Sequence, residues 1–146
     1  MPYERILLAL DFHIDNEAII DKAKEVVASN SAELYLIHVN EPLGMAYSAD
    51  GMTWSEQVVE LETSIRNESR IKMKELGEQL GVPSSHCFSC EGKAASEIHK
   101  LCNEQSIGLV VMGTHGQSGL QLLLGSTANS VLHGSPCDVL TVRIHD

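Results

Sequence analysis

The sequence is poor in positive charge. Ten Lys and Arg residues stand against 20 Asp and Glu, which leaves a formal net charge of −10 at pH 7. A chain this acidic repels phosphate backbones and anionic lipid, so we expect no sequence-independent binding to nucleic acid or to a membrane surface. The shortage is also local, because no Lys or Arg occurs from Leu101 to Val142.

Long hydrophobic runs are missing as well. The longest apolar run in the first dozen residues, Ile6 to Leu10, is ended by Asp11 and is too short for the core of a signal peptide. No segment approaches the roughly 18 apolar residues that span a membrane. With 146 residues, 43% of them hydrophobic, the composition predicts a single soluble domain over residues 1–146, located in the cytoplasm.

Cysteine is scarce, and its spacing does not favour a metal site. The chain has only Cys87, Cys90, Cys102 and Cys137, too few for a disulfide scaffold at this length, and a cytosolic protein keeps its thiols reduced. Cys87 and Cys90 form a CxxC pair, but residues three apart on a strand point to opposite faces, which is poor geometry for one metal ion. We therefore predict no metal site and interpret these as packing cysteines.

What the sequence does contain is an alternation of apolar runs and amphipathic segments. The runs that read as strands are Arg5 to Asp11, Glu33 to Val39, His86 to Cys90, Leu109 to Met112 and Cys137 to Ile144. The expected helices start at a cap at Asp15, at a capping box of Thr53 and Glu56, at Lys93 and at Ser126, and Gly81 to Pro83 ends the second one.

This alternation predicts a fold class. Strands that alternate with helices pair in parallel through right-handed crossovers. The first and fourth strands are almost continuously apolar, so they need helices on both faces and belong in the centre of the sheet. The sequence therefore predicts an α/β fold with an open, doubly wound, five-stranded parallel sheet of order 3-2-1-4-5. Ligands of such folds bind beyond the carboxyl ends of the strands at the switch point, here between the first and fourth strands.

The segment after the fourth strand has features of a phosphate site. Gly113, Gly116 and Gly119 can adopt positive φ or let a ligand approach the backbone closely. Gly125-Ser126-Thr127 opens a helix, whose free N–H groups favour an anion. A turn that simply needs its glycines fits the same spacing. The segment is neither a Walker A loop nor a GxGxxG fingerprint.

These residues also carry a resemblance to a known family. The stretches ILLALD, IHV, MGTHG, LLLGSTANSVL and SPCDVLTVR, which cover the chain, are similar to those of bacterial universal stress proteins. The nucleotide-binding branch of that family has Gly-x2-Gly-x9-Gly-(Ser/Thr). This sequence has Gly113-x2-Gly116 and then, after eight residues, Gly125-Ser126. The resemblance implies a homodimeric α/β domain that binds ATP or a related adenine nucleotide such as AMP and acts in the stress response.

The resemblance also implies a role for each matching residue. Asp11 would lie beside the ribose, and the backbone of Val39 beside the adenine. Met112 and Gly113 would line the sugar. The residues that would receive phosphates are Gly116, Gly125, Ser126 and Thr127. The last strand would pair with its counterpart across the dimer.

The lack of basic residues in this segment limits the expected affinity. Gln117 follows the second glycine, so the phosphates would depend on backbone N–H groups, hydroxyls, His115 and a divalent ion such as Mg²⁺. A hydrogen bond to a charged group contributes only about 1.5–3 kcal/mol net, so we expect binding that is weak or Mg²⁺-dependent. His115 could donate to a phosphate or be an ordinary loop histidine, and Asp11 could accept ribose hydroxyls or cap a turn.

Two other functions stay open. A dimeric stress-response interaction protein of the same fold that binds no nucleotide is favoured by the eight-residue spacing and the missing basic residues, whereas the glycines favour nucleotide binding. The second function that stays open is that of a phosphohydrolase. No catalytic residue is predicted, because no general base is visible and phosphoryl transfer needs positioned cations, so any ATP hydrolysis is expected to be slow at most.

Overall fold

Five parallel strands form one sheet in the computed structural model, which describes residues 2–12, 16–41, 56–114 and 126–144. The strands are β1 (Arg5–Leu10), β2 (Glu33–Asn40), β3 (Cys87–Glu91), β4 (Leu109–Thr114) and β5 (Asp138–Arg143). They are ordered β3-β2-β1-β4-β5, and every pairing is parallel. The predicted fold class and strand order are confirmed.

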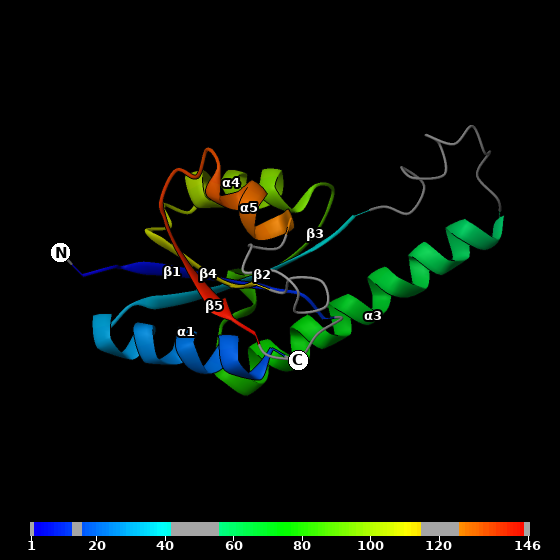
Figure 1. Ribbon diagram of the computed structural model, residues 1–146. Helices are drawn as coiled ribbons and strands as arrows, with labels where there is room; N and C mark the ends of the chain where they lie inside the picture. The colour runs from blue at the N-terminus through cyan, green and yellow to red at the C-terminus, as the bar shows by residue number, and fades with distance from the viewer. Residues whose placement is uncertain (1, 13–15, 42–55, 115–125, 145–146) are drawn as a thin grey trace.

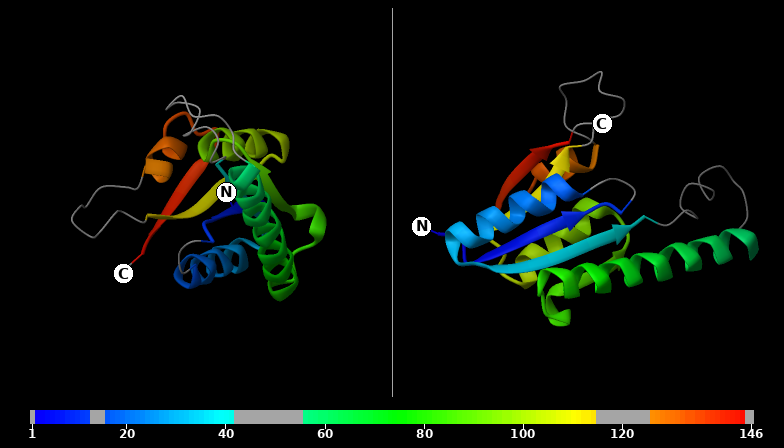
Figure 2. Two further views of the ribbon diagram at one scale, coloured as in Figure 1. Left: turned by 90° about the vertical axis from the view of Figure 1, so that its right-hand side faces the viewer. Right: turned by 90° about the horizontal axis from the view of Figure 1, so that it is seen from below.

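Helices cover both faces of this sheet. They are α1 (Glu17–Asn30), α3 (Glu56–Leu80), α4 (Ala94–Glu104) and α5 (Ser126–Leu132), and a 3-10 turn, η1 (Ser84–His86), precedes β3. Figure 1 shows α4 and α5 on one face and α1 and α3 on the other, and Figure 2 shows the same layers from two further sides. Because α1 and α5 lie on opposite faces, the chain switches face between β1 and β4, as the doubly wound arrangement requires.

Each face has its own apolar cluster. The cluster under α4 and α5 includes Leu7, Ile37, Val110, Met112, Ile98, Leu101, Ala128 and Val131. The cluster under α1 and α3 includes Ile6, Leu8, Leu36, Val111, Ile19, Ala23 and Met73. Successive strand residues alternate between the two clusters, since side chains on a strand point to opposite faces. The continuous apolar runs of β1 and β4 follow directly from this double burial.

The ends of the elements lie close to the predicted positions. Gly81, expected to stop the long helix, has φ 70°, and its N–H donates to Glu78 O at 3.2 Å while the N–H of Val82 donates to Gly77 O at 2.8 Å. These bonds satisfy carbonyls of the last turn of α3. The expected caps at Asp15 and Thr53 lie outside the described residues.

Helix α3 reaches beyond the sheet. Its buried residues, Ser69, Met73 and Gly77, all belong to the second half of the helix, and Figure 2 shows its first turns extending past the carboxyl ends of β1 and β2. In the part of the chain that the structure describes, neither α3 nor any other helix is both long and apolar enough to cross a membrane.

Candidate functional site

The carboxyl ends of β2 and β1 place two of the predicted site residues side by side. Leu10 of β1 is paired with His38 of β2. Asp11 and Val39 are the next residues along the two parallel chains, so both lie at the carboxyl edge of the sheet. This is the position that the resemblance assigns to the ribose and the adenine.

Strand β4 brings two more predicted residues to the same edge. Leu8 of β1 is paired with Val111 of β4, so Met112 and Gly113 continue toward the carboxyl end beside the end of β1. Residues from β2, β1 and β4 therefore converge at the switch point, although they are far apart in the sequence.

Met112 and Val39 face the α5 side of the sheet. Met112 is 4% exposed and belongs to the same cluster as Ala128 and Val131 of α5, and the partly buried Val39 packs against that cluster. Thr127, at the start of α5, is half-buried. The apolar side chains of Met112 and Val39 and the beginning of α5 thus lie on one side of the sheet, where a ligand could contact both.

The side of Gly113 on which a Cβ atom would lie is on the opposite face of the sheet. A Cβ atom built on Gly113 would lie 2.6 Å from Ile19 Cδ1 and would also collide with the side chain of Ile144. Both isoleucines pack with the cluster under α1 and α3. A side chain at this position would have to displace the ends of Ile19 and Ile144, so internal packing favours glycine here.

The backbone that follows β1 is held by the side chain of the residue that precedes the next helix. Asn16, the residue before α1, donates from Nδ2 to the backbone carbonyl of Asp11 at 2.9 Å, and it makes no side-chain capping bond to α1 itself. Asp11 is half-buried. On the α1–α3 side of this turn, the ring of Phe12 lies 4.7 Å from that of the buried His38. The position of Asp11 is thus fixed from two directions.

Part of the predicted site lies outside the described residues. His115, Gly116 and Gly125 belong to this part, so their predicted roles stay predictions. Ser126 is the first residue of α5.

A cation that the sequence analysis missed lies at this edge. Arg143, the last residue of β5, is paired with Thr114, the last residue of β4. Alternation along β5 puts Arg143 on the same face as Val139, which packs against the cluster under α4 and α5. Arg143 is exposed and makes no ion pair within the described part of the chain. The parallel pairing of β5 with β4 brings it beside Thr114, and that pairing is the signal that could have revealed it.

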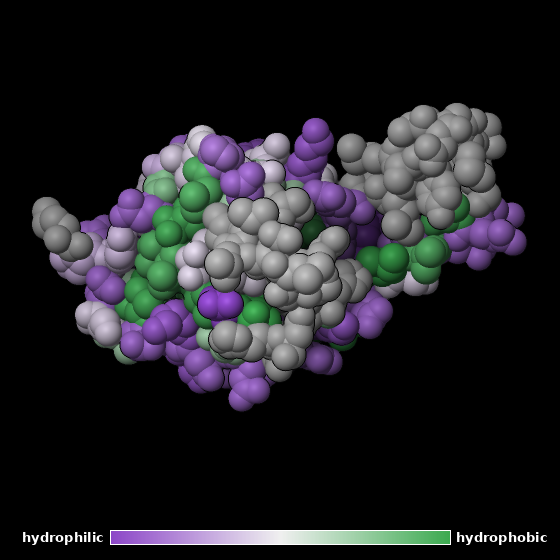
Figure 3. Space-filling view, in the orientation of Figure 1, coloured by the Kyte–Doolittle hydropathy of each residue, from purple (hydrophilic) through white to green (hydrophobic). Residues whose placement is uncertain are grey.

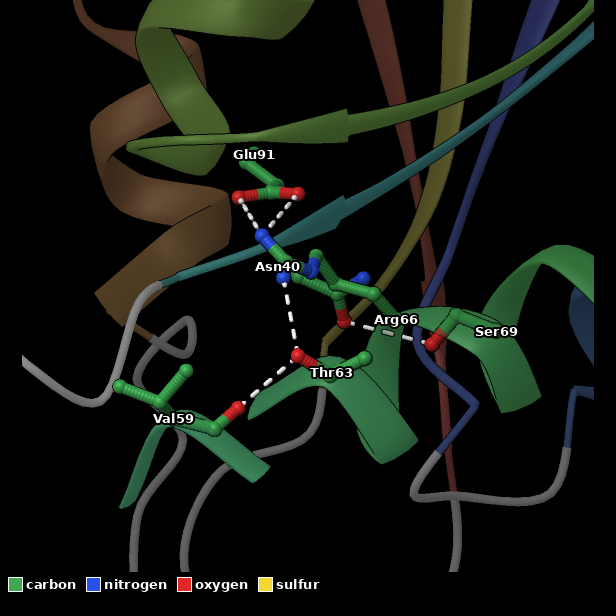
Figure 4. Close-up of polar contacts among 6 residues, drawn as sticks. All are labelled: Asn40, Val59, Thr63, Arg66, Ser69 and Glu91. Carbon is green, nitrogen blue, oxygen red and sulfur yellow. Dashed lines mark hydrogen bonds and ion pairs between the residues drawn. The ribbon is translucent and has the colours of Figure 1, made fainter. Parts of the chain in front are cut away.

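A second cation near the edge is already neutralised. Arg66 of α3 lies 3.0 and 3.1 Å from the two carboxylate oxygens of Glu91, at the end of β3, and it also donates to Thr63 Oγ1 at 3.3 Å. One turn further on, Ser69 donates to Asn40 Oδ1 at 3.3 Å (Figure 4). These contacts fasten α3 to the ends of β2 and β3. Arg66 therefore has an ion-pair partner, whereas Arg143 has none among the residues that the structure describes.

The described residues do not form a metal site by themselves. Within the described ranges, no group of three or more His, Cys, Asp or Glu side chains is arranged to hold a metal ion. Mg²⁺ is commonly bound through one or two carboxylates together with substrate phosphates and water. Asp11 is therefore a candidate ligand only for a metal ion that arrives with phosphates.

Comparisons with known proteins agree with this architecture. The family model described as "Universal stress protein family" matches residues 2–143. Universal stress protein A homolog 2 of Coxiella burnetii is 39% identical over 143 residues, covering 97% of this chain and 96% of that protein. Among solved structures, the universal stress protein UspA from Lactobacillus plantarum superposes with a TM-score of 0.74 at 18% identity, over 98% of this chain and 99% of that chain. A universal stress protein solved in complex with cAMP superposes with a TM-score of 0.59 at 21% identity, over 98% of both chains.

Proposed function

Because this chain belongs to the universal stress protein family, we propose that it binds an adenine nucleotide, ATP or AMP, as a regulatory protein of the stress response. The single observation that carries the proposal is the convergence of Asp11, Val39 and Met112 at the carboxyl edge, beside the start of α5. The cAMP bound to one structural neighbour supports a ligand of this class. The proposal includes a single domain over residues 1–146 and a cytoplasmic location.

The described residues fit the two halves of a nucleotide differently. Val39 and Met112 offer an apolar surface suited to a purine and a sugar, and the Asp11 carboxylate can accept hydrogen bonds from ribose hydroxyls. The start of α5 offers backbone N–H groups and the hydroxyl of Thr127 toward phosphate oxygens. We assign to Arg143 the role of the protein cation for the phosphates, since its charge has no partner among the described residues.

The charge balance explains why we expect weak or Mg²⁺-dependent binding. One exposed arginine offsets little of the charge of a triphosphate, and the protein itself carries a net charge of −10. Mg²⁺ would be held by phosphate oxygens and by Asp11. AMP needs less neutralisation than ATP, so Mg²⁺ should matter less for AMP.

We also propose a homodimer formed through β5. This strand lies at the edge of the sheet, and its outer side pairs with no strand in the part of the chain that the structure describes. Its four inner residues are half-buried rather than buried. Figure 3, in the orientation of Figure 1, shows a band of hydrophobic surface in the region where β5 faces the viewer. An unpaired apolar edge strand is a template for pairing with a second chain. Light scattering should give the mass of a dimer, and a monomer mass at micromolar concentration would rule this out.

Calorimetric titration tests the nucleotide proposal. We expect heat on addition of ATP that grows with Mg²⁺, and a smaller Mg²⁺ dependence with AMP. Arg143→Gln should weaken ATP binding about tenfold, at the low end for a hydrogen bond to a charged group because the side chain is exposed. Arg66→Gln is the matched control, since Arg66 is bound to Glu91, and should leave the affinity unchanged. No heat at millimolar nucleotide would favour the alternative, a dimeric interaction protein without a nucleotide.

Slow ATP hydrolysis is the most that the described residues support. Among the described carboxylates at this edge, Glu41 accepts from Ala94 N–H at 3.4 Å and Glu91 is bonded to Arg66 at 3.0 Å. The described cations there without an ion pair are Arg143 and the exposed Lys93, which follows β3. Phosphoryl transfer depends on charges held in position at the phosphates. Phosphate release that disappears in Asp11→Ala, with the fold retained, would instead show that the chain is a phosphohydrolase.

A further inference from the structure

Two cysteines that are 35 positions apart in the sequence lie next to each other in the fold. The sulfur atoms of Cys102 and Cys137 are 3.7 Å apart. Cys102 is in the last turns of α4 and is 3% exposed, whereas Cys137 is half-buried in the bend before β5. Backbone bonds hold the two segments together, because Ile107 N–H donates to Cys102 O at 3.0 Å and Asp138 N–H donates to Gly108 O at 3.3 Å.

Ser135 fixes the bend that carries Cys137. Its hydroxyl donates to Cys137 O at 2.7 Å and accepts from Cys137 N–H at 3.3 Å, and the same oxygen lies 4.0 Å from Cys137 Sγ. The backbone of Cys137 is therefore held in place while its thiol lies against that of Cys102. Since Cys137 is outside any helix or strand, its side chain has more room to adjust than that of Cys102.

The environment makes the two thiols unequal. In the neutral pair the Cys137 thiol donates to Cys102 Sγ. Once Cys137 has lost its proton, the Cys102 thiol donates to the thiolate instead, which lowers the pKa of Cys137 to about 7; burial and the nearby Asp138 carboxylate oppose this and Ser135 assists it. The same hydrogen bond, together with burial, raises the pKa of Cys102. Asp138 is itself bonded to the hydroxyl of Tyr3 at 2.7 Å. The two thiols therefore titrate as a pair, in which the pKa of the half-buried Cys137 is the one that is lowered.

The other two cysteines provide a contrast within the same chain. Cys87 packs in the cluster under α1 and α3, and Cys90 packs in the cluster under α4 and α5. The CxxC residues therefore point to opposite faces, as the sequence predicted. Burial raises the pKa of both thiols. They can serve as internal references for a pair that does react.

We propose that Cys102 and Cys137 are a peroxide-sensitive dithiol, which a hydroperoxide converts to an intramolecular disulfide between the end of α4 and the start of β5. The half-buried Cys137 is the residue that the hydroperoxide oxidises. The buried Cys102 is the residue that then forms the disulfide with it. The proposal is independent of nucleotide binding, because it rests on the thiol pair alone.

The chemistry needs only one named oxidant. The Cys137 thiolate attacks a peroxide oxygen of hydrogen peroxide, the O–O bond breaks, and hydroxide leaves and takes up a proton, which gives a sulfenic acid on Cys137. The Cys102 thiol then loses its proton as its sulfur attacks the Cys137 sulfur, and water leaves. Two thiols and one hydrogen peroxide become one disulfide and two water molecules. A dithiol reductant reverses the change by thiol–disulfide exchange.

Peptide mapping of the full-length protein is the direct test. The folded, reduced chain is treated with a small excess of hydrogen peroxide, the remaining thiols are alkylated with iodoacetamide, and a digest is examined by mass spectrometry. We expect a peptide containing Cys102 linked to one containing Cys137, with both freed by dithiothreitol, while Cys87 and Cys90 remain alkylated. Full alkylation of Cys102 and Cys137 after peroxide, or a link between other cysteines, would overturn the proposal.

Variants separate the two roles. In Cys102→Ala, a dimedone adduct should accumulate on Cys137, because its sulfenic acid has no resolving thiol. In Cys137→Ala, Cys102 should stay reduced. The matched control, Cys87→Ala combined with Cys90→Ala, should form the link as the unaltered chain does. Since the mapping of the unaltered chain needs no variant, a variant that fails to fold leaves the test intact.

Discussion

Closing the Cys102–Cys137 link should raise the thermal stability of the chain by an amount that the position of the two residues sets. A cross-link stabilises mainly by restricting the unfolded chain, and the effect grows with the length of the closed loop. The two cysteines are 35 positions apart, and the loop-entropy relation gives about 4 kcal/mol for a loop of this length.

This free energy converts to a shift in the melting temperature. At about 2.1 cal/mol/K per residue, the unfolding entropy of 146 residues is roughly 0.3 kcal/mol/K, so the upper limit of the shift is about 12 °C. The observed value should be smaller, because the sulfurs must approach from 3.7 Å to a bond length of about 2.05 Å. That approach strains the folded state. We expect the melting temperature to rise by about 5–10 °C.

Differential scanning calorimetry of the oxidised and the reduced chain measures this shift. The sample is oxidised with peroxide, the excess is removed, and the link is verified by mapping before the scan. Cys137→Ala, treated in the same way, should melt at the same temperature before and after oxidation. A chain with the mapped link whose melting temperature is unchanged or lower would refute the reasoning that loop entropy in the unfolded chain dominates.

Three further outcomes follow from particular residues. The rate at which iodoacetamide modifies Cys137 should rise with pH as the thiolate forms, with a midpoint near the pKa of about 7. In Cys102→Ala this midpoint should move to higher pH, because the donor that lowers the pKa of Cys137 is gone. Mass spectrometry of the alkylated protein over a series of pH values measures both midpoints. Gly81→Ala should lower the free energy of unfolding in urea by about 1 kcal/mol, since φ is 70° and no atom lies within 4 Å of an added Cβ, so that only backbone strain is paid; Gly81→Asn should lose less. Gly113→Ala should destabilise the ligand-free protein by about 1–3 kcal/mol through crowding of Ile19, and an unchanged urea midpoint would contradict the packing role of this glycine.

The sequence predicted those parts of the fold that depend on local pattern. The continuous apolar runs of β1 and β4 located the centre of the sheet, because only doubly covered strands bury every residue. Gly81 located the end of α3, because a residue with positive φ was needed there. Once the centre and the alternation were known, right-handed crossovers made 3-2-1-4-5 a plausible strand order.

The parts that the sequence did not reveal depend on contacts across the sheet. Cys102 and Cys137 looked like separate packing residues, since nothing local predicts that the end of α4 meets the start of β5. Arg143 lies just outside the stretch without basic residues, yet the pairing of β5 with β4 brings it beside Thr114. That Gly113 lines the sugar of a nucleotide stays a prediction. The structure adds that the space where a Cβ would lie is filled by Ile19 and Ile144, and which face a glycine presents is known only once the register is known.

The proposed nucleotide site and the proposed dithiol lie at opposite ends of the same strand, so experiments should be able to separate the two. Cys137 precedes β5 and Arg143 ends it, and at about 3.3 Å per residue the six steps between them span roughly 20 Å. The interior of β5 is paired with β4 along its whole length, so a small movement of the bend at Cys137 has no easy route to the carboxyl edge. The oxidised and the reduced chain should therefore bind ATP with the same affinity. A large difference would mean that the link distorts the sheet, which the paired register of β4 and β5 argues against.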